Sequence, residues 1–129
     1  MNVKIDTKEK FTVIRPAETE IPANMTAEMG NLLSSYIKKD PPHVVLNLAD
    51  VKNISEEAAQ SIAIIQHEFY EKNFSFVICE MQEAVDALFD KLELMEVMNV
   101  TPTESEAWDI VQMEEIEREL LGDFDEEGN

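Results

Sequence analysis

Residues 44–60, with the sequence VVLNLADVKNISEEAAQ, decide the fold of this chain. The stretch opens on an apolar run without alternation, which is typical of a strand buried on both faces and covered by helices. A short polar loop follows, and apolar residues then recur at helical spacing from Ala58 to Phe69. The stretch therefore predicts a central strand that leads through a loop into a helix N-terminus, where open α/β sheets tend to carry their sites.

The rest of the chain continues this alternation of strands and helices. Two short strands joined by a hairpin are predicted within residues 3–14, and residues 17–21 are expected to be irregular with at most a short edge segment. A further strand is predicted at 74–79. Residues 94–100 fit either a frayed helix end or a turn with a short edge strand, and the strand, at 98–100, is favoured. Helices are predicted from a cap at Asn24 or Thr26 to Lys39, at 56–72, at 83–92, and from a capping box at Thr103 and Glu106. The order predicts an α/β fold, a mixed sheet of four to five strands with about four helices.

Composition favours one small domain. The chain has 129 residues, of which 44% are hydrophobic. This is enough for a single core. We expect the domain to cover residues 1–115, followed over 116–129 by the end of the last helix and a disordered acidic tail. No apolar run approaches the roughly 18–20 residues of a membrane span, and the single cysteine, Cys79, favours a reducing, cytoplasmic location.

The charge is strongly negative, with a net value of −18. Residues 104–129 contribute eleven acids against the single base Arg118. Such a chain repels nucleic acid and the anionic membrane surface, so neither is expected as a partner. Two interpretations stay open: the acids attract a basic protein surface, or they only keep the protein in solution.

The central stretch also resembles a known family. The pattern formed by Leu46-Asn47-Leu48, Asp50-Val51 and Ile54-Ser55-Glu56-Glu57-Ala58 is similar to the core signature of STAS domains, the anti-sigma factor antagonist fold. In that family the helix starts with aspartate-serine-serine-glycine, and a partner kinase phosphorylates the second serine. Aligned without gaps, Ser55 falls on the aspartate, Glu56 on the first serine, Glu57 on the phosphorylated serine and Ala58 on the glycine. Element order extends the resemblance to about residue 115.

The resemblance implies a non-enzymatic, bacterial protein–protein interaction module that acts in signal transduction and transcription regulation. Its partner would be an anti-sigma factor or a GHKL-type switch kinase. The docking segment would be the loop and helix start at residues 53–60, which includes Asn53. Asp50, Ser55, Glu56 and Glu57 would form its acidic contact edge, and Ile54 and Ala58 would set the helix start. Glu57 would hold a permanent carboxylate where the family carries a phosphate. Ser55 is the less favoured acceptor, since an N-cap hydroxyl is engaged with backbone N–H groups.

A purely structural explanation of Ser55, Glu56 and Glu57 stays open beside the functional one. Serine is a preferred N-cap, and acids in the first helical turn are stabilised by the helix dipole. Physical chemistry alone would place these residues at the start of almost any helix.

Other candidate sites are weaker. His43 and His67 have no second ligand at metal-binding spacing, Cys79 ends a buried strand, and the three glycines form no phosphate loop. No metal, cofactor or enzymatic activity is therefore expected. In the last helix, Ile116, Leu120 and Leu121 form an apolar stripe for a partner or for a second copy in a homodimer, unless the stripe packs on its own sheet. The alternative function is that of a STAS domain that senses a ligand or serves as a scaffold, including as a subunit of a lipid-transport complex.

Overall fold

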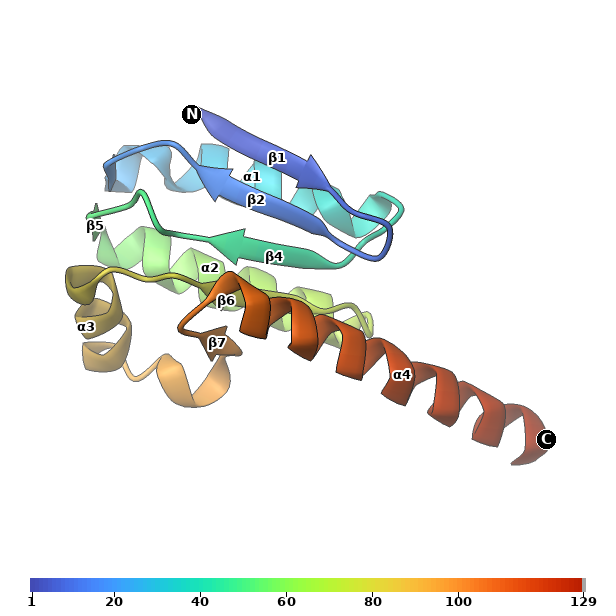
Figure 1. Ribbon diagram of the computed structural model, residues 1–129. Helices are drawn as coiled ribbons and strands as arrows, with labels where there is room; N and C mark the ends of the chain where they lie inside the picture. The colour runs from blue at the N-terminus through green and yellow to red at the C-terminus, as the bar shows by residue number, and fades with distance from the viewer. Residues whose placement is uncertain (129) are drawn as a thin grey trace.

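The protein forms a mixed five-stranded sheet with helices on both faces (Figure 1). The computed structural model describes the backbone of residues 1–128 and the side chains of residues 1–121. The sheet has the order β1-β2-β4-β6-β7. Strand β1 is antiparallel to β2, and all the other neighbours are parallel. The strands are β1 (Val3–Thr7), β2 (Thr12–Pro16), β4 (Val44–Asn47), β6 (Phe76–Cys79) and β7 (Val100–Thr101).

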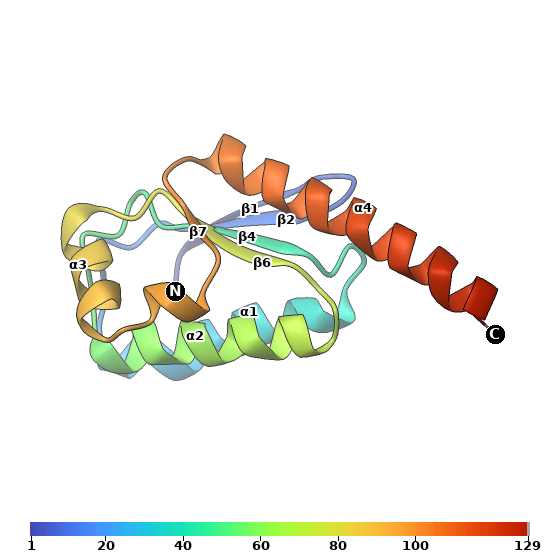
Figure 2. The same ribbon diagram turned by 90° about the horizontal axis from the view of Figure 1, so that it is seen from below.

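The helices form two unequal layers. Figure 2 shows α1 (Thr26–Ser35) and α2 (Glu56–Glu71) side by side on one face of the sheet, with α3 (Glu83–Lys91) at the end of this layer. The other face carries α4 (Glu104–Gly128), which crosses the sheet and runs on past it. The predicted mixed α/β fold with about four helices is therefore confirmed.

The two-sided cover explains the unalternating central strands. In β4 and β6, Val44, Leu46, Phe76 and Ile78 belong to the core under α1 and α2. Their sequence neighbours Val45, Val77 and Cys79 pack instead with Ala107 and Val111 of α4. Successive strand residues point to opposite faces, so both sets must be apolar. The prediction of two inner strands was right for this reason.

Short connecting elements differ from the sequence prediction in detail. Two-residue strands β3 (Glu20–Ile21) and β5 (Asn53–Ile54) pair in parallel as a second, small sheet. Three 3₁₀ turns, η1 (Ala23–Met25), η2 (Tyr36–Lys38) and η3 (Met95–Val97), flank the helices. The predicted cap of α1 was wrong, because the helix continues from η1 and no side chain, neither Asn24 nor Thr26, caps it.

Helix α4 extends well past the domain boundary predicted at residue 115, since its backbone is helical to Gly128. The predicted acidic tail falls largely on residues 122–129, whose side chains lie outside the described part of the chain, as does all of Asn129. The predicted disorder of that tail therefore stays a prediction. Within residues 1–128, no helix combines the length and the apolar character that a membrane span requires.

Candidate functional site

The segment singled out in the sequence lies where the chain passes from β4 into α2. The loop between them is tied to residues 17–21. The N–H of Lys52 donates to the carbonyl of Thr19 at 2.7 Å, and the N–H of Ser55 donates to the carbonyl of Ile21 at 2.9 Å. Through these bonds and the β3–β5 pair, two irregular segments hold each other. The start of α2 is therefore positioned by backbone contacts that sequence patterns do not reveal.

Ser55 caps α2. Its backbone is extended, and its Oγ accepts a hydrogen bond from the N–H of Ala58 at 3.1 Å. An N-cap of this kind satisfies one of the four free donors at a helix start. The hydroxyl is thus occupied, as expected for Ser55. Ala58 itself is fully buried, so it contributes its backbone and a core methyl group rather than a contact surface.

Glu56 and Glu57 occupy the first turn of α2, and both are exposed. The carboxylate of Glu56 lies 3.9 Å from the Nζ of Lys91 at the end of α3, in a solvated pair of the kind that adds little stability. Among the described side chains, Glu57 forms no ion pair and no hydrogen bond. Glu57 is therefore the freer of the two negative charges at this helix start.

Asp50 does not contribute a free charge to the same edge. Its two carboxylate oxygens accept hydrogen bonds from Nε and Nη2 of Arg15, each at 3.0 Å. These hydrogen bonds lower the pKa of Asp50, so the pair stays ionised at neutral pH. Both side chains are part-exposed. Asp50 thus joins the loop to the end of β2. Of the four residues predicted to form the acidic edge, Glu56 and Glu57 remain as its negative charges.

The remaining predicted residues divide by exposure. Asn53 is exposed, whereas Ile54 is half-buried and packs against the core under α2. Asn53 and Ile54 form β5, so their backbone groups pair with β3. Of the residues named as partner contacts, Asn53, Glu56 and Glu57 have exposed side chains, and Lys52 and Gln60 near them are exposed as well.

Glu57 also borders a groove between α1 and α2. The groove has a volume of about 580 Å³. Its walls are close to the backbone, because small residues face one another there: at Gly30, a methyl group would sit 3.5 Å from the Oγ of Ser61. Polar and small side chains predominate along it, with the exposed Ile64 at the rim. The groove therefore offers a shallow surface that begins at Glu57.

Sequence reasoning missed a polar cluster at the carboxyl ends of β4 and β6. The carboxylate of Glu80 accepts the N–H of Glu104 at 2.9 Å and so caps α4. The amide of Asn47 donates to the carboxylate of Glu104 at 2.9 Å. Glu80 has a φ of 60°, in the left-handed region that non-glycine residues seldom occupy. Strand ends of a parallel sheet meet at one edge, but nothing in the sequence pairs these residues.

Cys79 and His67, which the sequence did not favour as functional residues, lie outside this site. Burial raises the pKa of the Cys79 thiol to about 12, so the thiol is inert at neutral pH. Within residues 1–121, no three potential metal ligands lie close enough together to hold an ion. His67 is exposed on α2 and pairs with Glu71.

Comparison with known proteins places this geometry in a family. The model of the STAS domain family matches residues 2–107. No curated protein sequence matches the chain. Similar solved structures include one from Thermotoga maritima assigned as an anti-sigma factor antagonist, with a TM-score of 0.77 at 17% identity, covering 85% of this chain and 94% of that one.

Two further structures extend the comparison. An anti-sigma factor antagonist (STAS) domain protein from Planctomyces limnophilus has a TM-score of 0.74 at 15% identity, covering 85% of this chain and 97% of its own. The Bacillus cell fate determinant SpoIIAA in its phosphorylated form has a TM-score of 0.63 at 15% identity, covering 85% and 99%. At such identities the likeness shows a shared fold.

Proposed function

Because the chain belongs to the STAS domain family, we propose that it acts as a non-enzymatic docking module of the anti-sigma factor antagonist type. The partner would be an anti-sigma factor or a GHKL-type switch kinase, in the cytoplasm. Docking would use the start of α2, with Asn53, Glu56 and Glu57 as the contact residues, and with Ser55 and Ala58 holding the helix start.

One observation carries the proposal: Glu57 presents an exposed, unpaired carboxylate in the first turn of α2. In the gapless alignment described above, this is the position of the phosphorylated serine. A carboxylate carries one negative charge where phosphoserine carries about 1.5–2, so Glu57 would imitate the phosphate only in part. The module would then be insensitive to a kinase at this position and adapted to a partner that tolerates an acid there.

The occupied hydroxyl of Ser55 supports the same conclusion. A kinase needs a free hydroxyl, and Ser55 Oγ already accepts the N–H of Ala58. Phosphorylation there would also put a bulky group within the cap. The groove beside Glu57 is a shallow, open surface with both polar and apolar lining, not an enclosed cavity. It therefore favours a protein contact over the apolar ligand pocket that the alternative, a sensory STAS domain, would need.

The experiment is a titration of the purified protein with the anti-sigma kinase of its own organism. Glu57→Lys should weaken binding at least tenfold, because it reverses the one free charge of the contact. Glu9→Lys, in the β1–β2 turn, makes the same charge change at another exposed position and should leave binding unchanged. Equal binding by wild type and Glu57→Lys would refute the assignment of the surface.

A second arm tests the phosphate position. With kinase and ATP, Glu57→Ser should gain phosphate on the new serine, while the wild-type chain should gain none. Phosphate on Ser55 of the wild-type chain would contradict the proposal of a locked module.

A further inference from the structure

The outward face of α4 carries an apolar stripe with no cover. Ala107 and Val111 are buried against the sheet. At 3.6 residues per turn, Met113, Ile116 and Leu120 fall on the opposite side of the helix. Their exposed fractions are 59%, 56% and 57%. The stripe expected from the sequence, Ile116, Leu120 and Leu121, could have packed on its own sheet, but all three side chains are exposed, Leu121 at 64%.

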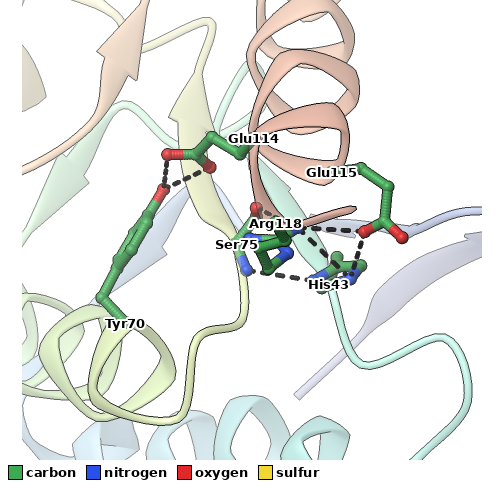
Figure 3. Close-up of polar contacts among 6 residues, drawn as sticks. All are labelled: His43, Tyr70, Ser75, Glu114, Glu115 and Arg118. Atoms are coloured by element: carbon green, nitrogen blue, oxygen red, sulfur yellow. Dashed lines mark hydrogen bonds and ion pairs between the residues drawn. The ribbon is translucent and has the colours of Figure 1, made fainter. Parts of the chain in front are cut away.

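Polar contacts fix this orientation of the helix (Figure 3). On the sheet side of α4, Nη2 of Arg118 donates to the Oγ of the buried Ser75 at 3.0 Å. Nε2 of His43 lies 3.2 Å from the carboxylate of Glu115. One turn before Arg118, the carboxylate of Glu114 accepts a hydrogen bond from the hydroxyl of Tyr70 at 2.8 Å. Rolling the helix to bury the stripe would break all three contacts, so the stripe stays outward.

The spacing of the stripe is that of a coiled-coil seam. Met113, Ile116 and Leu120 are separated by three and then four residues, as the a, d and a positions of a heptad are. The positions that flank such a seam, e and g, are then Glu117 and Glu119. In coiled coils, charges at e and g select the partner helix.

The charge of α4 decides which kind of partner can bind the apolar stripe. Residues 104–121 contain seven acids and one base, Arg118. The side chain of Arg118 is only 16% exposed and faces the sheet. A second copy of the chain would set Glu117 and Glu119 against the same acids, and an anionic lipid surface or a nucleic acid would be repelled as well. Lys10 of the β1–β2 turn borders the surface beside Ile116 and Glu119, but the acids of α4 outnumber it. A helix with basic flanks therefore complements this surface best.

We infer that the outward face of α4 is a second docking surface, which binds a basic amphipathic helix of a partner protein. The seam covers about two helical turns, so the contact is short. It lies on the face of the sheet opposite α2, apart from the surface proposed around Glu57 (Figure 2). The inference is therefore independent of the proposed function.

The test uses the full chain and a labelled helical peptide with leucine at a and d and lysine at e and g, with binding followed by fluorescence anisotropy. The matched control is a peptide of the same composition in scrambled order. The patterned peptide should bind at least tenfold more tightly than the scrambled one. Equal binding of the two would reduce the interaction to general charge attraction and overturn the inference.

Variants of the protein locate the contact. The combined change Met113→Ala, Ile116→Ala and Leu120→Ala should weaken binding at least tenfold. Ile64→Ala removes a similarly exposed apolar side chain from α2 and should have no effect. Glu117→Lys with Glu119→Lys should abolish binding of the lysine peptide and create binding of a peptide with glutamate at e and g. If either the triple alanine variant or the double lysine variant left peptide binding unchanged, the inference would be overturned.

Two further measurements separate this surface from others. Glu57→Lys should leave peptide binding unchanged, and a loss there would show that the peptide binds at the start of α2 instead. Sedimentation velocity of the wild-type chain should give a monomer. A dimer that the triple alanine variant dissociates would show that a second copy covers the stripe, and the inference would fail.

Discussion

Helices α2 and α4 begin alike. Both start at the carboxyl edge of the sheet, and both are capped by a hydroxyl group: Ser55 Oγ accepts the N–H of Ala58, and Thr103 Oγ1 accepts the N–H of Glu106. Each has acids in its first turn. In α4, however, the carboxylate of Glu104 accepts the amide of Asn47, whereas Glu57 of α2 has no such partner among the described residues. Two similar helix starts, each with a hydroxyl cap and early acids, thus give one acid that serves the fold and one that is free.

The two helices also end differently. Helix α2 is held along its length by apolar contacts, down to the fully buried Phe69 in its last turn. The second half of α4 is held by polar contacts through Glu114, Glu115 and Arg118, and then leaves the sheet. The inward side of each helix is taken up by contacts with the sheet, apolar in α2 and polar in the second half of α4, whose outward side carries the apolar stripe. The contrast teaches that contacts across the sheet, not helix sequence, decide what stays available.

The largest effect is expected from a variant that removes an apolar contact between α2 and the sheet. Phe69→Ala removes a buried ring that packs edge-on against Phe76 at a centroid distance of 5.0 Å. The free energy of unfolding should fall by about 3–5 kcal/mol, measured by urea denaturation. Leu120→Ala, on the outer face of α4, should change it by less than about 0.5 kcal/mol. A comparable loss in both variants would contradict the contrast between the two helices.

The polar contacts that hold the second half of α4 should contribute less to the free energy of unfolding than the apolar contacts of α2. Arg118→Ala deletes the hydrogen bond to the buried Ser75 and should lower the free energy of unfolding by about 1–3 kcal/mol. Glu119→Ala changes a charge one residue further on and serves as the control. The same urea denaturation distinguishes the two. If Arg118→Ala is as mild as the control, the second half of α4 has no anchor at this residue.

The caps provide a finer comparison. Ser55→Ala should cost about 1 kcal/mol, and Ser55→Asp should restore most of it. Thr103→Ala should cost less than Ser55→Ala, because the hydrogen bond that Thr103 accepts from the N–H of Glu106 is longer, at 3.3 Å, and exposed, so water can replace it. Thermal or urea unfolding of the three variants measures this. Equal costs at the two helices would mean that exposure of the cap does not weaken it.

The smallest effect is a dependence on pH. Burial, followed by the charge of Arg118, lowers the pKa of His43, against the opposing influence of Glu115. Nδ1 of His43 accepts the N–H of Ser75 at 3.0 Å, so a proton on Nδ1 would break that bond. The unfolded chain therefore takes up the proton first.

The stabilising contribution of the neutral ring is complete above about pH 6.5, and it declines as the pH falls from there through the folded-state pKa. His43→Asn keeps an acceptor near Nδ1 and cannot titrate. The difference in unfolding free energy between wild type and this variant should thus shift against the wild type between pH 7 and pH 5. A constant difference would refute this role of His43.

Local patterns in the sequence were sufficient to predict the layers of the fold and the N-cap of α2. The unalternating runs of β4 and β6 predicted inner strands, because a sheet covered on both faces needs apolar residues on both sides. The predicted edge strand at 98–100 exists as the shorter β7 (Val100–Thr101), which starts two residues later and ends one residue later. The cap at Ser55 was predictable because its donor lies only three residues away. Strands β3 and β5 were not, since two residues leave no periodicity.

Contacts between residues far apart in the chain could not be predicted from the sequence. Asp50 was predicted as part of the acidic edge, yet Arg15, 35 positions earlier, occupies both of its oxygens. Glu104 and Asn47 are 57 positions apart, and Arg118 and Ser75 are 43 apart. Whether an acid is free thus depends on which strand ends the fold brings together. The same limit applied to α4, where the pattern of apolar residues was visible but not the direction in which they point.

The position of the C-terminus has a practical consequence. Helix α4 continues for ten residues after Arg118, a rise of about 15 Å, away from the edge of the sheet where α2 begins (Figure 1). A fluorophore or an immobilising tag fused there is carried away from Glu57 by the direction of the helical backbone. Sensor-chip and pull-down formats attached at this end therefore leave the start of α2 unobstructed, whereas attachment at Met1, whose amino group pairs with Glu28 of α1, would disturb a structural contact.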